Sequence, residues 1–214
     1  MIFSICGIDP GYTGGLSIFL KNDMENPIVY KMPLLKEVKI IKGKKKIKHF
    51  YDLLQIRKIF NQYLDKNSVF FIEKVSSHPG EGSVSSFNFG RGLGNLEGLI
   101  IGLFDNIPMS VTPQSWKKAF PELITDEMRD IKAEMKDLRA SGKKIKGKEA
   151  QKENKRQVDK LGRKFKSLAK TEARELVSTL YPCLSDRLVK KNTDGLAESV
   201  LISIYGKNKL MEGD

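Results

Sequence analysis

Three strand-like segments crowd into the first 33 residues, and their spacing restricts the folds that the chain can adopt. The first, residues 2–8, is a continuous apolar run that ends in the turn cluster Asp9 to Gly15. A run of this kind predicts a strand buried on both faces of a sheet. The next two segments, 16–20 and 28–32, follow after short connections. We therefore expect an antiparallel meander at the start of the sheet.

Strand-like and helical segments alternate through the rest of the chain. Residues 69–72 and 107–112 predict two further strands. A lysine-rich stretch over 36–48 predicts an exposed basic hairpin or loop, and a Gly/Ser/Pro-rich stretch over 76–86 predicts a loop. The expected helices are the segment after Asp52, a glycine-rich one over 89–104 whose five glycines suit close packing against a sheet, a short one opened by Pro113, and the segments 168–180 and 193–205. This order predicts an α/β or α+β fold, with a mixed sheet and helices on its faces.

The segment 126–166 differs from the rest of the chain in composition. Only 11 of its 41 residues are hydrophobic, and its 15 basic and 8 acidic residues give it a net charge of +7. Apolar side chains recur at spacings of three and four residues in two stripes, Met128 to Leu138 and Val158 to Leu168. Two narrow stripes of this kind predict a helical hairpin. We therefore interpret the chain as a single domain over 1–214 that carries an inserted basic helical hairpin.

The balance of charge indicates a polyanionic partner. The chain has 38 Lys and Arg against 26 Asp and Glu, a net charge of +12. Nucleic acid is the simplest such partner, and an anionic membrane surface is the alternative. No apolar run reaches the roughly 20 residues of a spanning helix, and the first residues lack the features of a signal peptide. Cys6 and Cys183 lie in apolar contexts typical of buried thiols, so we expect a cytoplasmic protein without a membrane partner.

Acidic side chains stand at the ends of two buried strands and on the last helix. Asp9 ends the first strand and Glu73 ends the fourth, while Asp194 and Glu198 share a helix face because they are four residues apart. Carboxylates gathered in this way can bind Mg²⁺, which prefers oxygen ligands. Two such ions roughly 4 Å apart can clamp the attacking and leaving oxygens in phosphoryl transfer. For each acid alone the alternative is structural: a turn former, an acid at a helix N-terminus, or a surface residue.

Several motifs together resemble those of RuvC-type Holliday junction resolvases. The run GIDPGYTG over 7–14 resembles the opening motif of the family, and IEKV over 72–75 resembles its second motif. The run TDGLAES over 193–199 resembles the helix that carries the last carboxylates. The runs HPGEG and SFNFG within 78–90, and VTPQSWKK over 111–118, look most like the phage branch of the family.

This resemblance covers residues 1–120 and about 167–206, and it implies a fold and an activity. The implied fold is α/β and ribonuclease H-like, with a five-stranded mixed sheet flanked by helices. The implied activity is Mg²⁺-dependent cleavage of branched DNA by a homodimer, with two ions per active site and Mn²⁺ as a substitute. The products would carry 5′-phosphate and 3′-hydroxyl ends. The implied setting is a bacterial cell or a phage-infected host.

The resemblance also implies which residues bind metal. Asp9, Glu73 and Asp194 match the metal-binding acids of the family. A fourth family ligand, usually Asp or His, lies three residues before the last Asp, where this chain has Lys191. A protonated lysine does not bind Mg²⁺. We therefore expect Glu198, one helical turn further on, to complete the catalytic and metal-binding set.

Six residues near these motifs are candidates for DNA contact: Lys74, His78, Phe87, Arg91, Lys117 and Lys118. The basic side chains would contact backbone phosphates, and Phe87 with Phe89 would stack on unpaired bases at a branch point. Each has a simpler alternative, because such lysines and arginines are often only solvated. We also expect at least one of the two phenylalanines to pack in the core, and Trp116 to pack rather than bind.

Two other functions are open on the sequence alone. Actin-like and sugar-kinase-like ATPases also begin with Gly-Ile-Asp-x-Gly, but this chain is short for a duplicated two-domain ATPase. No second phosphate loop of the Asp-x-Gly-Gly type follows in the sequence. A non-catalytic DNA-binding module is the other alternative, and the retained Asp9, Glu73 and Asp194 argue against it. Metal-dependent nicking of a four-way junction would separate the three.

Overall fold

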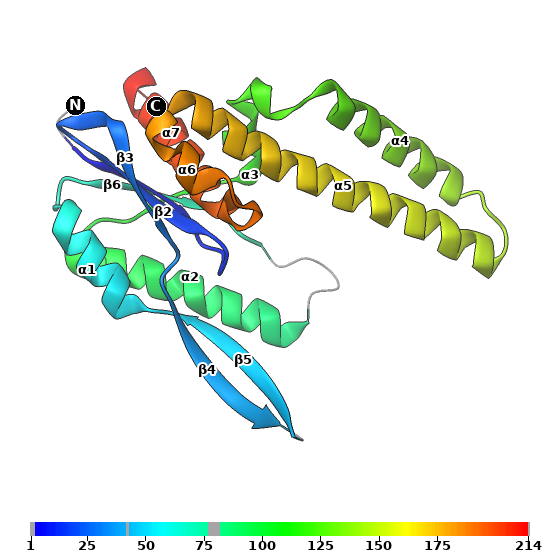
Figure 1. Cartoon of the computed structure of the whole chain (residues 1–214), viewed down its shortest axis with the longest axis horizontal. Coiled ribbons are helices and arrows are strands. Elements are labelled where there is room, and N and C mark those ends of the chain that lie inside the picture. Colours follow the sequence, from blue (N-terminus) through cyan, green and yellow to red (C-terminus); the bar gives the residue numbers. More distant parts are fainter. Residues whose placement is uncertain (1–2, 42, 77–81, 214) are drawn as a thin grey trace.

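A five-stranded mixed sheet forms the centre of the protein. The structure is a computed structural model that describes residues 3–41, 43–76 and 82–213, and over these the sheet has the order β3-β2-β1-β6-β7 (Figure 1). The strands are β1 (Ile5–Asp9), β2 (Gly15–Leu20), β3 (Asp23–Lys31), β6 (Val69–Glu73) and β7 (Met109–Val111). β1, β2 and β3 form the predicted antiparallel meander, and β6 and β7 continue the sheet parallel to β1. This order and these directions are those of the ribonuclease H-like α/β fold, as predicted.

Strand β1 is covered on both faces, which explains its continuous apolar sequence. Helices α1 (Leu53–Tyr63) and α2 (Ser83–Phe104) pack on one face of the sheet, and α7 (Asp194–Glu212) packs on the other. At the crossing of β1 and α7, a Cβ on Gly7 would collide with the backbone of Ser199. The close approach that glycine allows brings the start of α7 to the end of β1.

Two elements project from this body (Figure 1). Strands β4 (Leu34–Ile41) and β5 (Lys44–Tyr51) pair antiparallel as a separate two-stranded sheet, called here the β-ribbon. Helices α4 (Asp126–Gly142) and α5 (Lys148–Leu180) pack against each other as a long hairpin. Its basic part, residues 126–166, is called here the helical arm. The predicted basic helical hairpin is therefore present in the fold.

Helix α5 is longer than the sequence pattern predicts. The stripe spacing predicts a hairpin that ends near 166 and a separate helix over 168–180, but one helix runs unbroken through both. It contains no proline, and the glycine within it, Gly162, faces the Met135 side chain of α4. Short helical segments complete the chain: α3 (Pro113–Lys118), α6 (Ser185–Leu188), and the 3₁₀ turns Pro121–Leu123, Pro182–Leu184 and Lys191–Thr193.

Helix α2 also differs from expectation. It begins at Ser83, so its first turn occupies part of the predicted 76–86 loop. Gly92 packs against the Tyr51 ring. At Gly90, Gly94, Gly98 and Gly102, no described atom beyond the adjoining backbone of α2 lies within 4 Å of the position that a Cβ would take. The predicted close packing of this glycine-rich helix is therefore wrong for four of its five glycines.

The two cysteines differ in their exposure. Cys6 is buried in the sheet, whereas Cys183 is exposed, so the prediction of two buried thiols is wrong for Cys183. Cys183 lies in the 3₁₀ turn Pro182–Leu184, in which Leu184 is buried in the core while Cys183 faces the surface. None of the helices in the described part of the chain has the length and apolar character needed to cross a membrane.

Candidate active site

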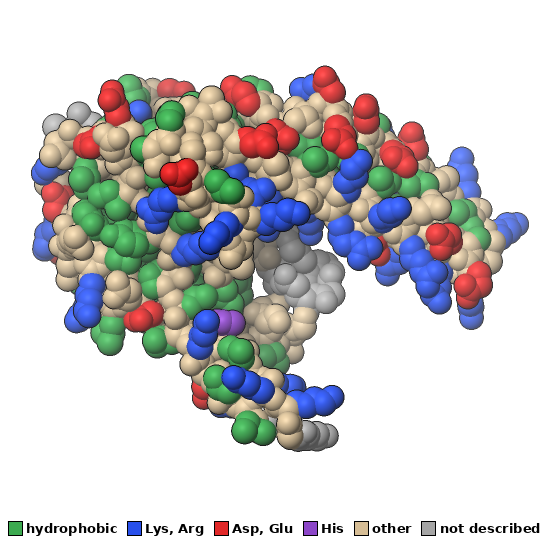
Figure 2. Space-filling view, viewed as in Figure 1, with side chains coloured by type: hydrophobic (Ala, Val, Ile, Leu, Met, Phe, Trp, Pro, Cys, Tyr) green, Lys and Arg blue, Asp and Glu red, His purple; other side chains and the backbone are tan. Residues whose placement is uncertain are grey.

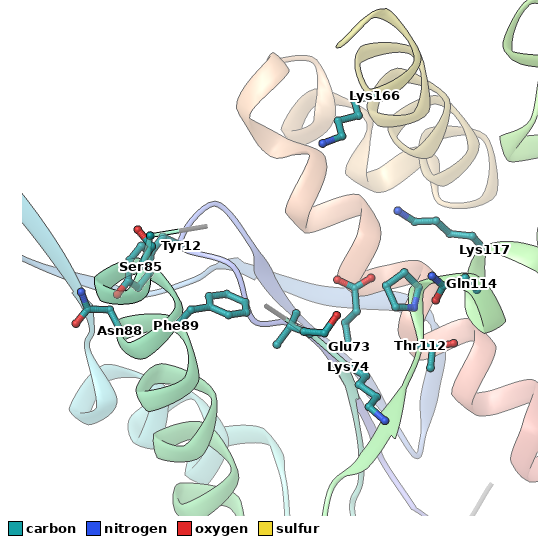
Figure 3. Close-up of a pocket in the computed structure, with 14 residues that line it drawn as sticks. Tyr12, Glu73, Lys74, Ser85, Asn88, Phe89, Thr112, Gln114, Lys117 and Lys166 are labelled. Carbon is teal, nitrogen blue, oxygen red and sulfur yellow. The ribbon is translucent and has the colours of Figure 1, made fainter. Parts of the chain in front are cut away.

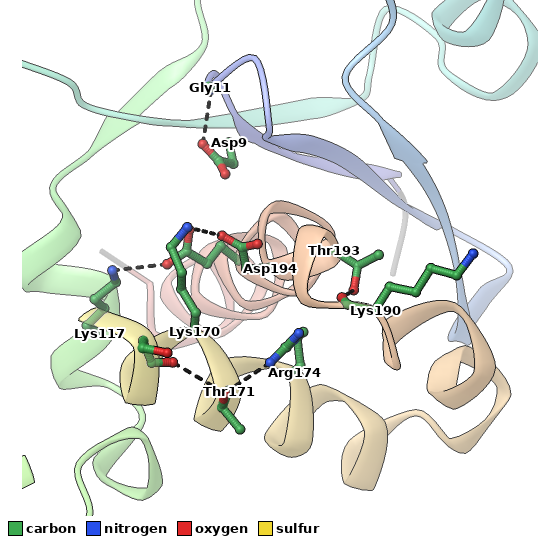
Figure 4. Close-up of polar contacts among 11 residues, drawn as sticks. Asp9, Gly11, Lys117, Lys170, Thr171, Arg174, Lys190, Thr193 and Asp194 are labelled. Carbon is green, nitrogen blue, oxygen red and sulfur yellow. Dashed lines mark hydrogen bonds and ion pairs between the residues drawn. The ribbon is translucent and has the colours of Figure 1, made fainter. Parts of the chain in front are cut away.

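Asp9 ends β1 in a tight turn that fixes its carboxylate. The backbone N–H of Gly11 donates a hydrogen bond to Asp9 Oδ1 at 3.1 Å, and the N–H of Gly14 donates to the Gly11 carbonyl at 2.8 Å. Gly14 is required in this turn because a Cβ there would collide with the carbonyl oxygen of Asp9. The Asp9 side chain faces the start of α7 (Figure 4).

Glu73 lies at the same edge of the sheet because β6 runs parallel beside β1. Its Oε1 accepts a hydrogen bond of 2.8 Å from Nε1 of Trp116. Trp116 is fully buried in α3, which is capped by Thr112 and opened by Pro113. The expectation that Trp116 packs in the core is confirmed, and its indole N–H also holds Glu73 in place.

Asp194 and Glu198 enter the site from the first turns of α7. Asp194 is only 5% exposed and forms an ion pair with Lys170 of α5. Glu198 Oε1 lies 3.1 Å from the Lys117 ammonium of α3 (Figure 4). Each of these two carboxylates is therefore paired with a lysine from a different helix.

The four acidic side chains influence one another electrostatically. Burial raises the pKa of Asp9 to about 8, and the charges of Glu198, Glu73 and Asp194 add to this effect against the hydrogen bond from Gly11. Burial also raises the pKa of Glu73, and the Glu198 charge acts in the same direction, while the Trp116 hydrogen bond and Lys117 oppose the rise. The fold thus gathers the four predicted acids at one edge of the sheet.

These carboxylates fit a hard divalent cation in the chemistry of their donor atoms, which are all oxygens. Burial and the neighbouring carboxylates together raise the pKa of Asp9, and a bound cation would stabilise its charged form. In the described part of the chain, however, no group of three or more His, Cys, Asp or Glu side chains is arranged to hold an ion. Lys117 and Lys170 now neutralise two of the carboxylates, so ion binding requires side-chain rotation at this site.

The raised pKa of Asp9 predicts how the stability of the metal-free protein depends on pH. The folded pKa, about 8, lies above the unfolded value of 3.8, so the folded state binds more protons between these limits. Stability in EDTA should therefore fall as pH rises from about 4 to about 8, by an amount of the order of a few kcal/mol for this group, and level off above.

Asp9→Asn is the matched control for this effect because the amide cannot titrate. Thermal unfolding in EDTA at a series of pH values should show the melting temperature of the Asp9→Asn variant rising relative to that of the wild type as pH increases, with the difference reaching its full size at about pH 8 and above. Parallel pH profiles for the two proteins would contradict the assignment of the raised pKa to Asp9.

An open groove of about 1050 Å³ borders Glu73 (Figure 3). Lys74, Lys117 and Lys166 line it together with Phe89 and Tyr12. The groove therefore combines positive charge with aromatic surface directly beside the carboxylates. Both features suit a nucleic-acid strand, whose phosphates and bases they would contact.

The other candidates for DNA contact lie elsewhere. Phe87 is 69% exposed on α2, and Arg91 stacks over the Phe50 ring of the β-ribbon at 5.3 Å. Lys118 is exposed on α3 and borders a second surface groove with Tyr205. His78 lies outside the described residues. Of the six predicted contacts, the structure thus places Lys74 and Lys117 in the groove.

Sequence reasoning missed Lys170 and Lys166 as parts of the site. Both lie on α5, in the stretch where the sequence pattern predicts the end of one helix and the start of another. Lysines are abundant in this segment, so neither stands out by composition. Only the packing of α5 beside α7 identifies them. Lys191, which stands where the sequence resemblance implies a fourth ligand, is exposed.

Comparisons with known proteins find similarity among solved structures. No family model and no curated protein matches the chain. Among solved structures it is similar to T. thermophilus RuvC in complex with a Holliday junction substrate, with 11% identity, a TM-score of 0.46, and coverage of 99% of this chain and 97% of that one. The fold assignment rests on the strand order and directions of this chain itself.

Proposed function

We propose that the protein is a metal-dependent endonuclease that cuts branched DNA, with the Holliday junction as its substrate. The observation that carries this proposal is the gathering of Asp9, Glu73, Asp194 and Glu198 at one edge of the sheet, beside a basic and aromatic groove. The two projecting basic elements suit a substrate that is larger than the groove and polyanionic. The products would carry 5′-phosphate and 3′-hydroxyl ends.

In this proposal Asp9, Glu73, Asp194 and Glu198 hold two Mg²⁺ ions, for which Mn²⁺ can substitute. Bound there, the ions would supply an activated water and stabilise charge on the scissile phosphate. The chain itself contributes the orientation of the carboxylates, through Gly11 at Asp9 and Trp116 at Glu73. Lys117 and Lys170 hold Glu198 and Asp194, respectively, in position before the ions bind.

We also propose that the protein acts as a homodimer, since resolving a four-way junction requires two cuts. The uncovered face of α2 supports this part of the proposal. Its glycines at 90, 94, 98 and 102 are spaced four residues apart, and their open Cβ positions would allow another helix to approach closely. Ile101, 44% exposed, offers apolar surface near the same helix end.

A cleavage assay on synthetic DNA tests the proposal. Four-way junctions, flaps and linear duplex of the same sequences are incubated with the protein, with and without Mg²⁺. We expect paired nicks in the four-way junction that depend on Mg²⁺ and that DNA ligase can reseal. Junction binding without cutting under all metal conditions would favour a non-catalytic module, and ATP hydrolysis without cutting would favour an ATPase.

Glu198→Gln should lower the rate of junction cutting by about 100-fold or more, which corresponds to about 3 kcal/mol in the activation barrier. The reason is that the Glu198 carboxylate is close enough to Asp9 and Glu73 for its charge to raise the pKa of both. Lys191→Ala should cut at close to the wild-type rate because Lys191 is exposed. Single-turnover rates for both variants check this. Near-normal cutting by Glu198→Gln would remove it from the ligand set.

A further inference from the structure

The net positive charge of the chain is concentrated on its two projecting elements. Residues 34–51, the β-ribbon, contain seven lysines and one glutamate, a net charge of +6, and the helical arm carries +7. Since the whole chain carries +12, all other residues together have a net charge of −1. The composition of the helical arm suits contact with a polyanion such as DNA. The β-ribbon carries almost the same charge in fewer than half as many residues.

The pairing of the β-ribbon brings like charges together. Lys39 lies directly opposite Lys46 in the antiparallel register, and opposed like charges destabilise a strand pair. The single acid of the ribbon, Glu37, pairs with Lys39 at 3.1 Å, which leaves Lys44, Lys45 and Lys46 at the outer end without a carboxylate on the ribbon. A polyanion bound along the ribbon would relieve this repulsion.

The base of the β-ribbon is fastened to the turn that carries Asp9. The Tyr51 hydroxyl donates a hydrogen bond to the Pro10 carbonyl oxygen, and the Tyr12 ring meets the Tyr51 ring edge-on at 5.5 Å. Tyr12 also contacts His49, with ring centroids 6.3 Å apart. The ribbon is therefore an ordered projection with a fixed root next to the candidate active site.

We propose that the β-ribbon is a second DNA-binding arm, which holds the phosphate backbone of a duplex on the side of the active site opposite the helical arm. The proposal rests on the proposed function, because it takes branched DNA as the ligand. Figure 2 shows Lys and Arg side chains along the borders of the hollow between the two projections. Each ribbon strand has eight residues, about 26 Å in length, and B-DNA offers one phosphate charge per about 1.7 Å of axis.

The composition of the ribbon indicates that it holds DNA without reading its sequence. Residues 34–51 contain no Arg, Asn or Gln, the side chains that most often form paired hydrogen bonds with base edges. Lysine contacts to phosphates position a protein but carry no sequence information. The β-ribbon should therefore strengthen binding equally for junctions of any sequence, and the choice of cleavage site should depend on other residues.

The test compares two triple variants that remove the same charge. Lys44, Lys45 and Lys46 are changed to Gln in the ribbon variant, and Lys21, Lys66 and Lys209 are changed to Gln in the control. The control lysines lie outside the β-ribbon, the helical arm and the groove beside Glu73, and each pairs with a carboxylate. Affinity for a four-way junction is measured in EDTA over a range of NaCl concentrations, so that no cutting interferes.

We expect the ribbon variant to lower the slope of log affinity against log salt by about 2 to 3, since each lost phosphate contact removes about 0.9. Affinity at 0.1 M salt should fall by about 100-fold, and the control should match the wild type. An unchanged slope in the ribbon variant, or an equal loss in both variants, overturns the proposal. So does loss of binding to phosphatidylserine vesicles while DNA binding is intact, which would assign the ribbon to a membrane surface.

A second ribbon variant checks that the loss of affinity does not come from misfolding. A separate measurement of cutting distinguishes failure of the ribbon proposal from failure of the proposed function. Lys36→Gln with Lys48→Gln removes two exposed charges nearer the root, and it should lower the slope by up to about 1.8. If the wild type binds junctions through the ribbon yet never cuts them with Mg²⁺, the proposed function fails and the ribbon proposal stands. If it cuts junctions while both ribbon variants bind like the wild type, only the ribbon proposal fails.

Discussion

Junction cutting by Asp9→Asn should be at least about 1,000-fold slower than by the wild type, while junction binding persists or tightens. The substitution removes a negative charge but almost no volume from the centre of the acidic cluster, where three other carboxylates already repel it. Loss of a ligand oxygen charge weakens metal binding, and several kcal/mol of transition-state stabilisation depend on the ions. Less negative charge also means less repulsion of the scissile phosphate. Single-turnover cutting and equilibrium binding to the same junction measure the two effects separately.

Asp23→Asn is a matched control, because Asp23 is an acid that caps a turn at the other end of the sheet, away from the carboxylate cluster. It should cut and bind like the wild type. Equal loss of binding and cutting in Asp9→Asn, together with a lower melting temperature, would assign Asp9 to folding instead of catalysis.

Shortening the helical arm should weaken junction binding and flatten its salt dependence. The segment to be removed is shorter than the whole helical arm. Met128 and Ile131 at the start of the arm are buried, and α5 continues beyond residue 166 into the site. Replacing 137–157 with a short Gly/Ser linker removes eight basic and three acidic residues and leaves Lys166 and Lys170 in place. If three of the lost side chains contact phosphate, the slope of log affinity against log salt should fall by about 2.7.

Titrations of wild-type and shortened protein over a range of salt concentrations check this, together with light scattering for the oligomeric state. Mg²⁺-dependent cutting should survive at high protein concentration, since no proposed ligand lies in the removed segment. The same slope in both proteins would contradict a DNA-binding role for the arm. A change from dimer to monomer would assign the arm to dimerisation.

The buried strands and the acids at their ends were predictable because both follow from local sequence. A continuous apolar run ending in Asp-Pro-Gly specifies a covered strand followed by a turn, and parallel neighbours bring their carboxyl ends to one edge. Asp9 and Glu73 therefore lie close together because each ends one of two adjacent parallel strands. Glu198 follows from the spacing of four residues that it shares with Asp194.

Other features depend on packing between distant segments, and no local pattern contains them. Lys170 pairs with Asp194 because α5 passes over the start of α7. The sequence of α5, in which lysines are spread along the helix, predicts neither the length of the helix nor its position. The early start of α2 is similar, because its serines and glycines favour turns and helix ends equally. The tyrosine contacts at the root of the β-ribbon join residues about 40 positions apart.

The unbroken course of α5 has a mechanical consequence for the site. Ala173 and Val177 are buried and anchor the helix, whereas its first residue, Lys148, lies 25 positions away, or about 38 Å at 1.5 Å per residue. A tilt of about 10° about Ala173 would swing that end by about 7 Å, yet Lys170, only about 4.5 Å from the pivot, would shift by less than about 1 Å. In the proposed function, the outer part of α5 would thus follow DNA branches that diverge at different angles, while the lysine beside Asp194 keeps its position.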